Sequence, residues 1–163
     1  MSEPESSSTP APDLSELLGP DLAAALAKKG YTTLTPVQQS VLDPSLEGRD
    51  LRISSQTGSG KTLAIGFALR NAVAGEPMKP TPVARPRALV IVPTRELAKQ
   101  VHDELTWLYA PQRLRIAAVI GGSSYRDEHR ALAAGPAIVV GTPGRLLDHL
   151  NRGGVEADDV GAV

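Results

Sequence analysis

The hydrophobic residues of this chain fall into short uninterrupted runs, separated by longer segments with helical spacing. The clearest runs cover 88–92 and 137–140, and the run at 115–120 is apolar after Arg115. Continuous apolar runs of this length are typical of strands that are buried on both faces of a sheet. Two weaker runs, 51–54 and 160–163, have the composition of a short strand and of the beginning of another.

The segments between these runs carry the start and stop residues of helices. Gly30 ends the first segment, Thr35 and Pro36 begin the second, and Thr94 precedes the longest. We expect helices over 21–29, 36–43, 63–69, 95–109, 124–134 and 145–151. Strands that alternate with helices through short links predict an α/β fold with a mostly parallel sheet, helices on both faces and right-handed crossovers.

Two segments fall outside this alternation. Residues 1–12 are rich in Ser, Pro and Glu, and we expect a disordered tail there. Residues 75–87 contain four prolines, and we expect a flexible or partly extended connection at the surface. The remaining residues, 13–163, are predicted to form one domain, because their number suits a single core of common size.

The composition excludes some classes of protein. The chain has no cysteine, so it has no disulfide and no thiolate metal site, which fits the reducing cytoplasm where we expect it. No apolar run approaches the roughly 18 residues of a membrane span, and the N-terminus lacks the pattern of a secretory signal. The net charge is −1, so any argument for nucleic-acid binding must rest on motifs.

The segment between 51–54 and the expected helix at 63–69 has the residues of a phosphate-binding loop. It reads Ser55, Gln56, Thr57, Gly58, Ser59, Gly60, Lys61, Thr62. Glycines let successive backbone N–H groups point at phosphate oxygens, the lysine can reach the β- and γ-phosphates, and the last hydroxyl can bind Mg²⁺. Ser55 stands where the general pattern has its first glycine, and the alternative is a polar turn that caps an ordinary helix. The order strand, loop, helix favours a nucleotide site.

Polar or glycine-rich turns also follow the other three strands. Because the carboxyl ends of parallel strands meet at one edge of a sheet, we expect these turns to form a rim beside the phosphate loop. Hydroxyls and helix N-termini at Thr94 and Thr142 suit phosphate groups, although both residues could simply cap helices. Arg95 and Arg145 could contact phosphate, and Arg95 could equally pair with Glu96 or a neighbouring loop. The candidates are Pro93, Thr94, Arg95, Gly121, Gly122, Thr142, Pro143, Gly144 and Arg145.

From residue 14 to residue 163, the order and spacing of these motifs resemble the first RecA-like domain of the DEAD-box ATP-dependent RNA helicases, a P-loop NTPase fold. Residues 30–38 resemble the Q motif of this family. The resemblance implies that Gln38 binds adenine. A side-chain amide can hydrogen-bond to the N6 and N7 atoms of adenine at the same time. Leu14 stands where the family usually has an aromatic residue against the base, and we expect Tyr31 to compensate in part.

The resemblance also implies cofactors and partners. ATP and Mg²⁺ would bind at 55–62, with Lys61 and Thr62 in the catalytic roles and Thr62 on the metal. The turns at 93–98, 121–122 and 142–145 resemble motif Ia, the GG motif and motif Ib, which hold the backbone of single-stranded RNA in the family. We therefore expect RNA binding that is independent of base sequence and sensitive to salt. We expect no membrane partner.

Several parts of the family's catalytic site are missing from this chain. The Asp-Glu-Ala-Asp motif, the arginine finger and the second RecA-like domain would lie beyond Val163, whereas Asp158 and Asp159 precede the last run, in an expected loop. We expect a sheet that is incomplete at its C-terminal end, and a fragment that binds ATP and RNA without hydrolysing ATP. The alternative is a non-catalytic module that binds RNA or a partner. A small-molecule kinase is a weaker alternative, because it does not account for the Gln38 motif.

The histidines and the single tryptophan give no further candidate site. His102, His129 and His149 lie within helical patterns and lack the spacing of metal ligands, so we expect them at the surface. Trp107 and Leu108 are expected to anchor the core or an interface.

Overall fold

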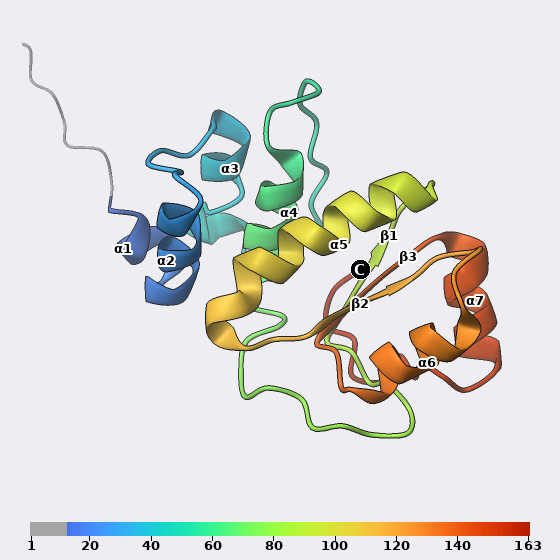
Figure 1. The fold of residues 1–163 in the computed structure, drawn as a ribbon. Coiled ribbons are helices and arrows are strands. Elements are labelled where there is room, and N and C mark those ends of the chain that lie inside the picture. Colours follow the sequence, from blue (N-terminus) through green and yellow to red (C-terminus); the bar gives the residue numbers. More distant parts are fainter. Residues whose placement is uncertain (1–12) are drawn as a thin grey trace, which may run out of the picture.

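The computed structural model describes residues 13–163, so the tail expected over 1–12 lies outside the described residues. Helices and strands alternate as the sequence predicts (Figure 1). The elements are α1 (Leu14–Leu18), α2 (Pro20–Lys28), α3 (Pro36–Ser40), η1 (Pro44–Leu46), α4 (Lys61–Leu69), β1 (Ala88–Ile91), α5 (Arg95–Tyr109), η2 (Ala110–Gln112), β2 (Ile116–Val119), α6 (Tyr125–Ala133), β3 (Ile138–Gly141) and α7 (Pro143–Asn151). The helix α1 and the 3₁₀ helices η1 and η2 are additions to the predicted set.

The three strands form one parallel sheet in the order β1-β3-β2. Ile91 at the end of β1 and Val119 at the end of β2 both lie beside Gly141 at the end of β3. The turns that follow the strands therefore emerge at the same edge of the sheet. This arrangement confirms the predicted α/β fold and brings the three candidate turns together.

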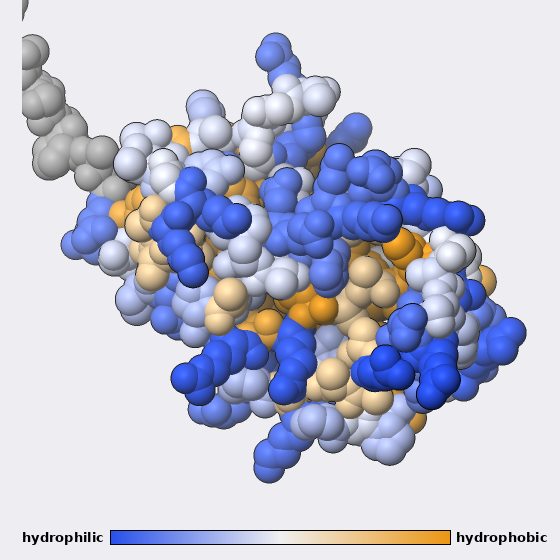
Figure 2. Space-filling model, viewed as in Figure 1, coloured by the Kyte–Doolittle hydropathy of each residue, from blue (hydrophilic) through white to orange (hydrophobic). Residues whose placement is uncertain are grey.

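Helices cover both faces of the sheet, because alternate strand residues point to opposite sides. Val90 packs into a core with Phe67 of α4 and Leu105 of α5. Leu89, one residue earlier in β1, packs into a second core with Leu132 of α6. Figure 1 shows α4 and α5 on one side of the sheet and α6 and α7 on the other. On the face drawn in Figure 2, hydrophobic residues show at the surface between these two layers.

The strand predicted at 51–54 is wrong, because this segment has no regular secondary structure. A strand exists only where a neighbour takes its backbone N–H and C=O groups. Within 13–163, no backbone partner is found for 51–54. Residues 160–163 form only the beginning of a strand: Ala162 makes a single parallel bridge with Ala88, on the side of β1 away from β3.

The proline-rich connection at 75–87 is less exposed than predicted. Ala84 is fully buried and forms a parallel bridge with Val155. Arg87 donates hydrogen bonds to the carbonyl oxygens of Val73, at 3.1 Å, and Glu76, at 2.9 Å. These contacts fix both the middle and the end of the connection.

Helix α5 packs tightly against α4, the helix that follows the phosphate loop. The Tyr109 hydroxyl donates a hydrogen bond to the carbonyl oxygen of Gly66 at 2.6 Å. Burial raises the pKa of Tyr109 far above its usual value, so the hydroxyl stays protonated as a donor. Leu108 is fully buried, as predicted for a core anchor, and Trp107 is half-buried against the same core. Among the described residues, no helix has the length and apolar character required to cross a membrane.

Candidate nucleotide and nucleic-acid sites

The loop at 55–62 has the backbone conformation of a phosphate cradle. Gly58 (φ 79°) and Gly60 (φ 82°) occupy the left-handed region, and Gly60 is the N-cap of α4. Lys61 donates hydrogen bonds from Nζ to the carbonyl oxygens of Ser55, at 2.6 Å, and Gln56, at 3.0 Å. Its ammonium group therefore lies across the loop.

The amide groups of this loop suit an anionic ligand. The first N–H groups of α4 have no acceptor within the helix, and those of Gly58 and Gly60 meet no backbone acceptor within 13–163. Thr62 lies in the first turn of α4 and adds a hydroxyl. The described residues contain no cluster of acidic or histidine side chains that could hold a metal ion by itself. Mg²⁺ fits this loop only when phosphate oxygens and water supply most of its ligands, with the hydroxyl of Thr62 as a protein ligand.

The loop is joined to α3 through the segment that resembles the Q motif. Thr35 and Gln38 form a capping box, in which the amide oxygen of Gln38 accepts a hydrogen bond from Thr35 N at 2.9 Å. The amide nitrogen of Gln38 donates to Gly60 O at 3.2 Å, and the Thr35 hydroxyl donates to Ser59 O at 2.8 Å. Gln38 is 2% exposed. Its adenine contact stays a prediction, and the structure adds a contact with the loop that sequence reasoning missed.

Tyr31 and Leu14, the residues expected near the base, both contact other parts of the protein. The ring of Tyr31 stacks on Trp107 of α5, with 6.0 Å between centroids, and is 42% exposed. Lys29 lies 5.3 Å from the Trp107 ring centroid. Leu14 packs against the core. One face of Tyr31 is thus used by Trp107, and its adenine contact stays a prediction.

The turns after the strands line an open cleft of about 540 Å³. Seven of the nine predicted RNA-binding residues line it, and Asp148 of α7 is an acidic addition that the motifs do not indicate. The lining residues are Pro93, Thr94, Arg95, Gly121, Thr142, Gly144, Arg145 and Asp148. The structure therefore brings the three motifs together as predicted.

The two threonines of the cleft differ in what their hydroxyls do. Thr94 accepts a hydrogen bond from Leu97 N at 3.3 Å, which is ordinary N-capping of α5. Thr142 is the N-cap of α7 without a capping hydrogen bond from its side chain. The Thr142 hydroxyl is therefore available to a ligand, whereas that of Thr94 already supports its helix.

The two arginines differ as well. The guanidinium of Arg95 lies directly against the turn after β2, since a Cβ atom at Gly122 would be 2.5 Å from its Nη1. Arg95 has no carboxylate within ion-pair distance in the described part of the chain. Arg145, in contrast, donates from Nε to Glu128 Oε2 at 2.7 Å. It also lies 4.0 Å from Asp148.

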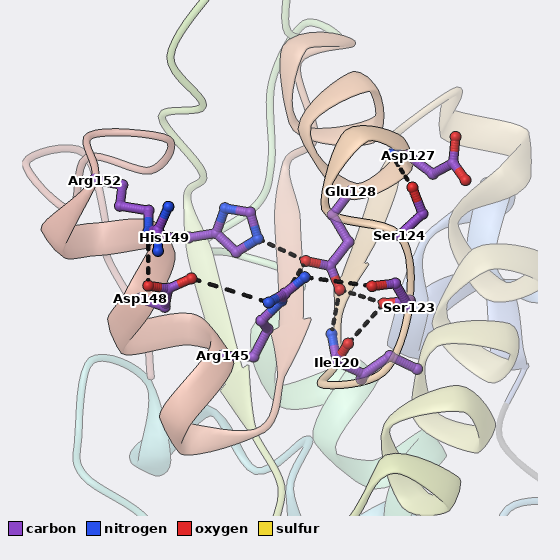
Figure 3. A network of polar contacts seen from close by, with 9 residues as sticks. All are labelled: Ile120, Ser123, Ser124, Asp127, Glu128, Arg145, Asp148, His149 and Arg152. Carbon is purple, nitrogen blue, oxygen red and sulfur yellow. Dashed lines mark hydrogen bonds and ion pairs between the residues drawn. The ribbon is translucent and has the colours of Figure 1, made fainter.

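Glu128 is the centre of a polar network that the sequence analysis missed (Figure 3). Its carboxylate accepts hydrogen bonds from Ile120 N, Ser123 Oγ, Arg145 Nε and His149 Nε2. Burial alone would raise the pKa of Glu128, but these hydrogen bonds outweigh it and hold the pKa below its ordinary value. A periodic signal exists for this placement, because Glu128 and Leu132 lie four residues apart on α6 and are both buried.

The predicted surface position of His149 is wrong, because this residue is fully buried. Its ring stacks on Tyr125 with 4.7 Å between centroids, and its Nε2 lies 2.7 Å from Glu128 Oε2. His129 is exposed, as predicted, and His102 is half-buried. His149 lies three residues after the buried Leu146, on the same face of α7, and its polar partner Glu128 lies on another helix.

Comparison with known sequences gives a consistent result. The model of the DEAD/DEAH box helicase family matches residues 35–163. The DEAD-box ATP-dependent RNA helicase 3B, chloroplastic, of Zea mays is 44% identical over 142 residues, which are 86% of this chain and 19% of the maize protein. The ATP-dependent RNA helicase DbpA of Bacillus subtilis is 43% identical over 138 residues, 85% of this chain and 28% of that protein. The chain thus spans less than a third of the length of these relatives.

Comparison with solved structures supports the predicted RecA-like fold. The RNA helicase Prp28 from Chaetomium thermophilum bound to ADP matches with a TM-score of 0.79 at 32% identity, over 93% of this chain and 36% of that one. A DEAD box protein from Methanococcus jannaschii matches with a TM-score of 0.72 at 34% identity, over 91% of this chain and 39% of that one.

Proposed function

This chain belongs to the DEAD/DEAH box helicase family, and from that premise we propose that it binds ATP and the backbone of single-stranded RNA as the first RecA-like domain of an ATP-dependent RNA helicase. The observation that supports this most is the shared sheet edge. There the turns of three parallel strands line one cleft. Within residues 13–163, the Thr142 side chain makes no capping hydrogen bond and the Arg95 guanidinium has no carboxylate at ion-pair distance.

At the nucleotide site, the N–H groups of the glycine-rich loop and the N-terminus of α4 would bind phosphate oxygens. Lys61 would exchange its carbonyl contacts for the β- and γ-phosphates, and Gln38 would hold Gly60 while contacting adenine. Mg²⁺, bound through the phosphates and Thr62, would neutralise charge on the phosphates. These residues bind and orient the nucleotide.

At the cleft, Arg95 and the Thr142 hydroxyl would contact phosphate or sugar oxygens, which carry no base sequence. The chain by itself is proposed to bind without turnover. Hydrolysis requires acidic groups on the metal and a residue that positions water. The described residues contain no group of three or more acidic or histidine side chains that could hold a metal ion. An RNA-stimulated ATPase assay on the purified chain tests this; robust turnover would refute it.

A binding experiment tests the proposal as a whole. Lys61→Ala should weaken binding of a fluorescent ATP analogue about 10- to 100-fold, the range of a lost hydrogen bond to a charged group. Lys28→Ala is the matched control, because Lys28 is exposed at the end of α2. Equal affinity of the two variants for the analogue would contradict the nucleotide site.

RNA binding is measured separately, with a fluorescent single-stranded RNA over a range of salt concentrations. Each phosphate contact contributes about 0.7 to the slope of log affinity against log salt, so Arg95→Gln should reduce the slope by about that amount. If RNA affinity does not depend on ATP and is unchanged in Lys61→Ala, the result would favour a non-catalytic RNA-binding module instead.

A further inference from the structure

The carboxylate of Glu128 connects two turns that line the cleft, while Glu128 itself does not line it. Its side chain is 3% exposed. Oxygen Oε1 accepts from Ile120 N at 2.9 Å and from the Ser123 hydroxyl, both in the segment that contains the turn after β2. Oxygen Oε2 accepts from Arg145 and His149, both on α7, at 2.7 Å each. Oxygen Oε1 therefore binds the turn after β2, and oxygen Oε2 binds α7 after β3 (Figure 3).

We propose that Glu128 is a positioning residue for RNA: it fixes the turn at 121–123 and the Arg145 side chain relative to each other, so that the cleft is shaped before RNA arrives. This inference rests on the proposed function of the cleft. It adds a residue that lies between the motifs and contacts no RNA.

The way Arg145 is held supports this role. Its guanidinium lies 4.9 Å from the Tyr125 ring centroid, donates to Glu128 through Nε, and reaches Ser123 O at 3.4 Å through Nη2. His149 packs on the same Tyr125 ring and shares Oε2. A side chain restrained from several directions loses little further freedom when it meets a ligand, which is the advantage of preorganisation.

A purely structural role would not call for a carboxylate here. Buried ion pairs can often be replaced by apolar residues of similar volume without loss of stability. The neighbouring Leu132 and Leu146 show that the same face of α6 and α7 packs well with apolar side chains. The charge at Glu128 is explained by the donors that it brings into one geometry.

The test uses Glu128→Gln in the full chain, with RNA and ATP-analogue affinities measured side by side. The amide oxygen can still accept from Ile120 N, but an NH₂ group then faces the donors of Arg145 and His149. RNA affinity should fall about tenfold, the equivalent of one charge-assisted hydrogen bond, while affinity for the ATP analogue stays within about twofold.

Asp127→Asn is the matched control, since it removes the same charge from the adjacent residue, whose side chain is 69% exposed. Loss of a negative charge beside a polyanion site should leave RNA affinity unchanged or raise it slightly. Glu128→Gln is expected to change it in the opposite direction. RNA affinity that is unchanged or higher in Glu128→Gln would overturn the proposal.

Two further variants separate positioning from simple misfolding. In an Arg145→Gln background, Glu128→Gln should have less than about half of its effect on the logarithm of RNA affinity, because the two residues act through one contact. Ser123→Ala removes one donor to Oε1 without a change of charge, and should weaken RNA binding about threefold even if Glu128→Gln fails to fold. Full additivity, or no effect of Ser123→Ala, would contradict the proposal. If the unmodified chain binds the ATP analogue but no RNA, the proposed RNA function of the cleft fails, and this inference with it.

Discussion

Gly60 is the point where the phosphate loop, α4 and α3 meet, and substituting it gives the sharpest prediction. Its φ of 82° lies in the left-handed region, so alanine there costs about 1–2 kcal/mol in backbone strain. A Cβ atom would also lie 2.3 Å from Gln38 Nε2. Gln38 must then move, and it loses its hydrogen bonds to Gly60 O and Thr35 N, at about 0.5–1.5 kcal/mol each.

Gly58→Ala is the matched control in the same loop. Gly58 has nearly the same φ, 79°, but a Cβ atom there would meet nothing within 4 Å. The control variant is therefore destabilised by backbone strain alone. We expect Gly60→Ala to lower the free energy of unfolding by about 2–5 kcal/mol and Gly58→Ala by about 1–2 kcal/mol. The reduced entropy of the unfolded chain affects both variants alike and cancels in the comparison.

The assay is urea unfolding of the two variants, followed by the same pair in a Gln38→Ala background. Without the Gln38 side chain there is no amide for the new Cβ to displace, so Gly60→Ala should then cost no more than Gly58→Ala. Equal losses in the native background, or an excess for Gly60→Ala that persists without Gln38, would refute the reasoning.

Two further predictions concern buried polar groups. Tyr109→Phe removes the donor to Gly66 O and should lower the free energy of unfolding in urea by about 1 kcal/mol, whereas Tyr31→Phe, at an exposed ring, should leave it unchanged. Because the pKa of Glu128 is held below its ordinary 4.5, its ionised form stabilises the fold above that value, and this contribution disappears as pH falls through the lowered pKa. The difference in unfolding free energy between the native chain and Glu128→Gln should therefore shrink below about pH 4.5, and a constant difference down to about pH 3 would contradict this assignment.

The sequence predicts well those parts of the fold whose structure is determined by neighbouring residues in the chain. The strand β3 is buried on both faces, so its apolar run is uninterrupted and its position is predicted within one residue. The start of α5 is predicted because the hydroxyl of Thr94 caps the helix whatever lies around it. Caps and continuous runs depend little on distant residues.

The parts that fail depend on partners far along the chain. The run at 51–54 has the composition of a strand, but a strand also needs a neighbour, and composition does not supply one. His149 is a polar residue, and the partner that satisfies it in the core, Glu128, lies 21 residues earlier and accepts its hydrogen bond. The motifs of the cleft are predicted one by one, whereas the hydrogen bonds through which Glu128 joins two of them are made by residues far apart in the sequence.

The contrast between Arg95 and Arg145 shows why this matters for function. Both follow the end of a strand, and the sequence makes both candidates for phosphate contacts, with Glu96 or a neighbouring loop as an alternative partner for Arg95 alone. In the structure, Arg95 lies against a glycine turn and has no carboxylate partner among the described residues, while Arg145 donates a hydrogen bond to Glu128. A guanidinium without an ion-pair partner can adjust to different positions of an RNA phosphate. A guanidinium that is held in place favours a single path of the RNA backbone between the turns. An adaptable contact beside a rigid one would suit the function proposed for this cleft, in which RNA of any base sequence is held in one register.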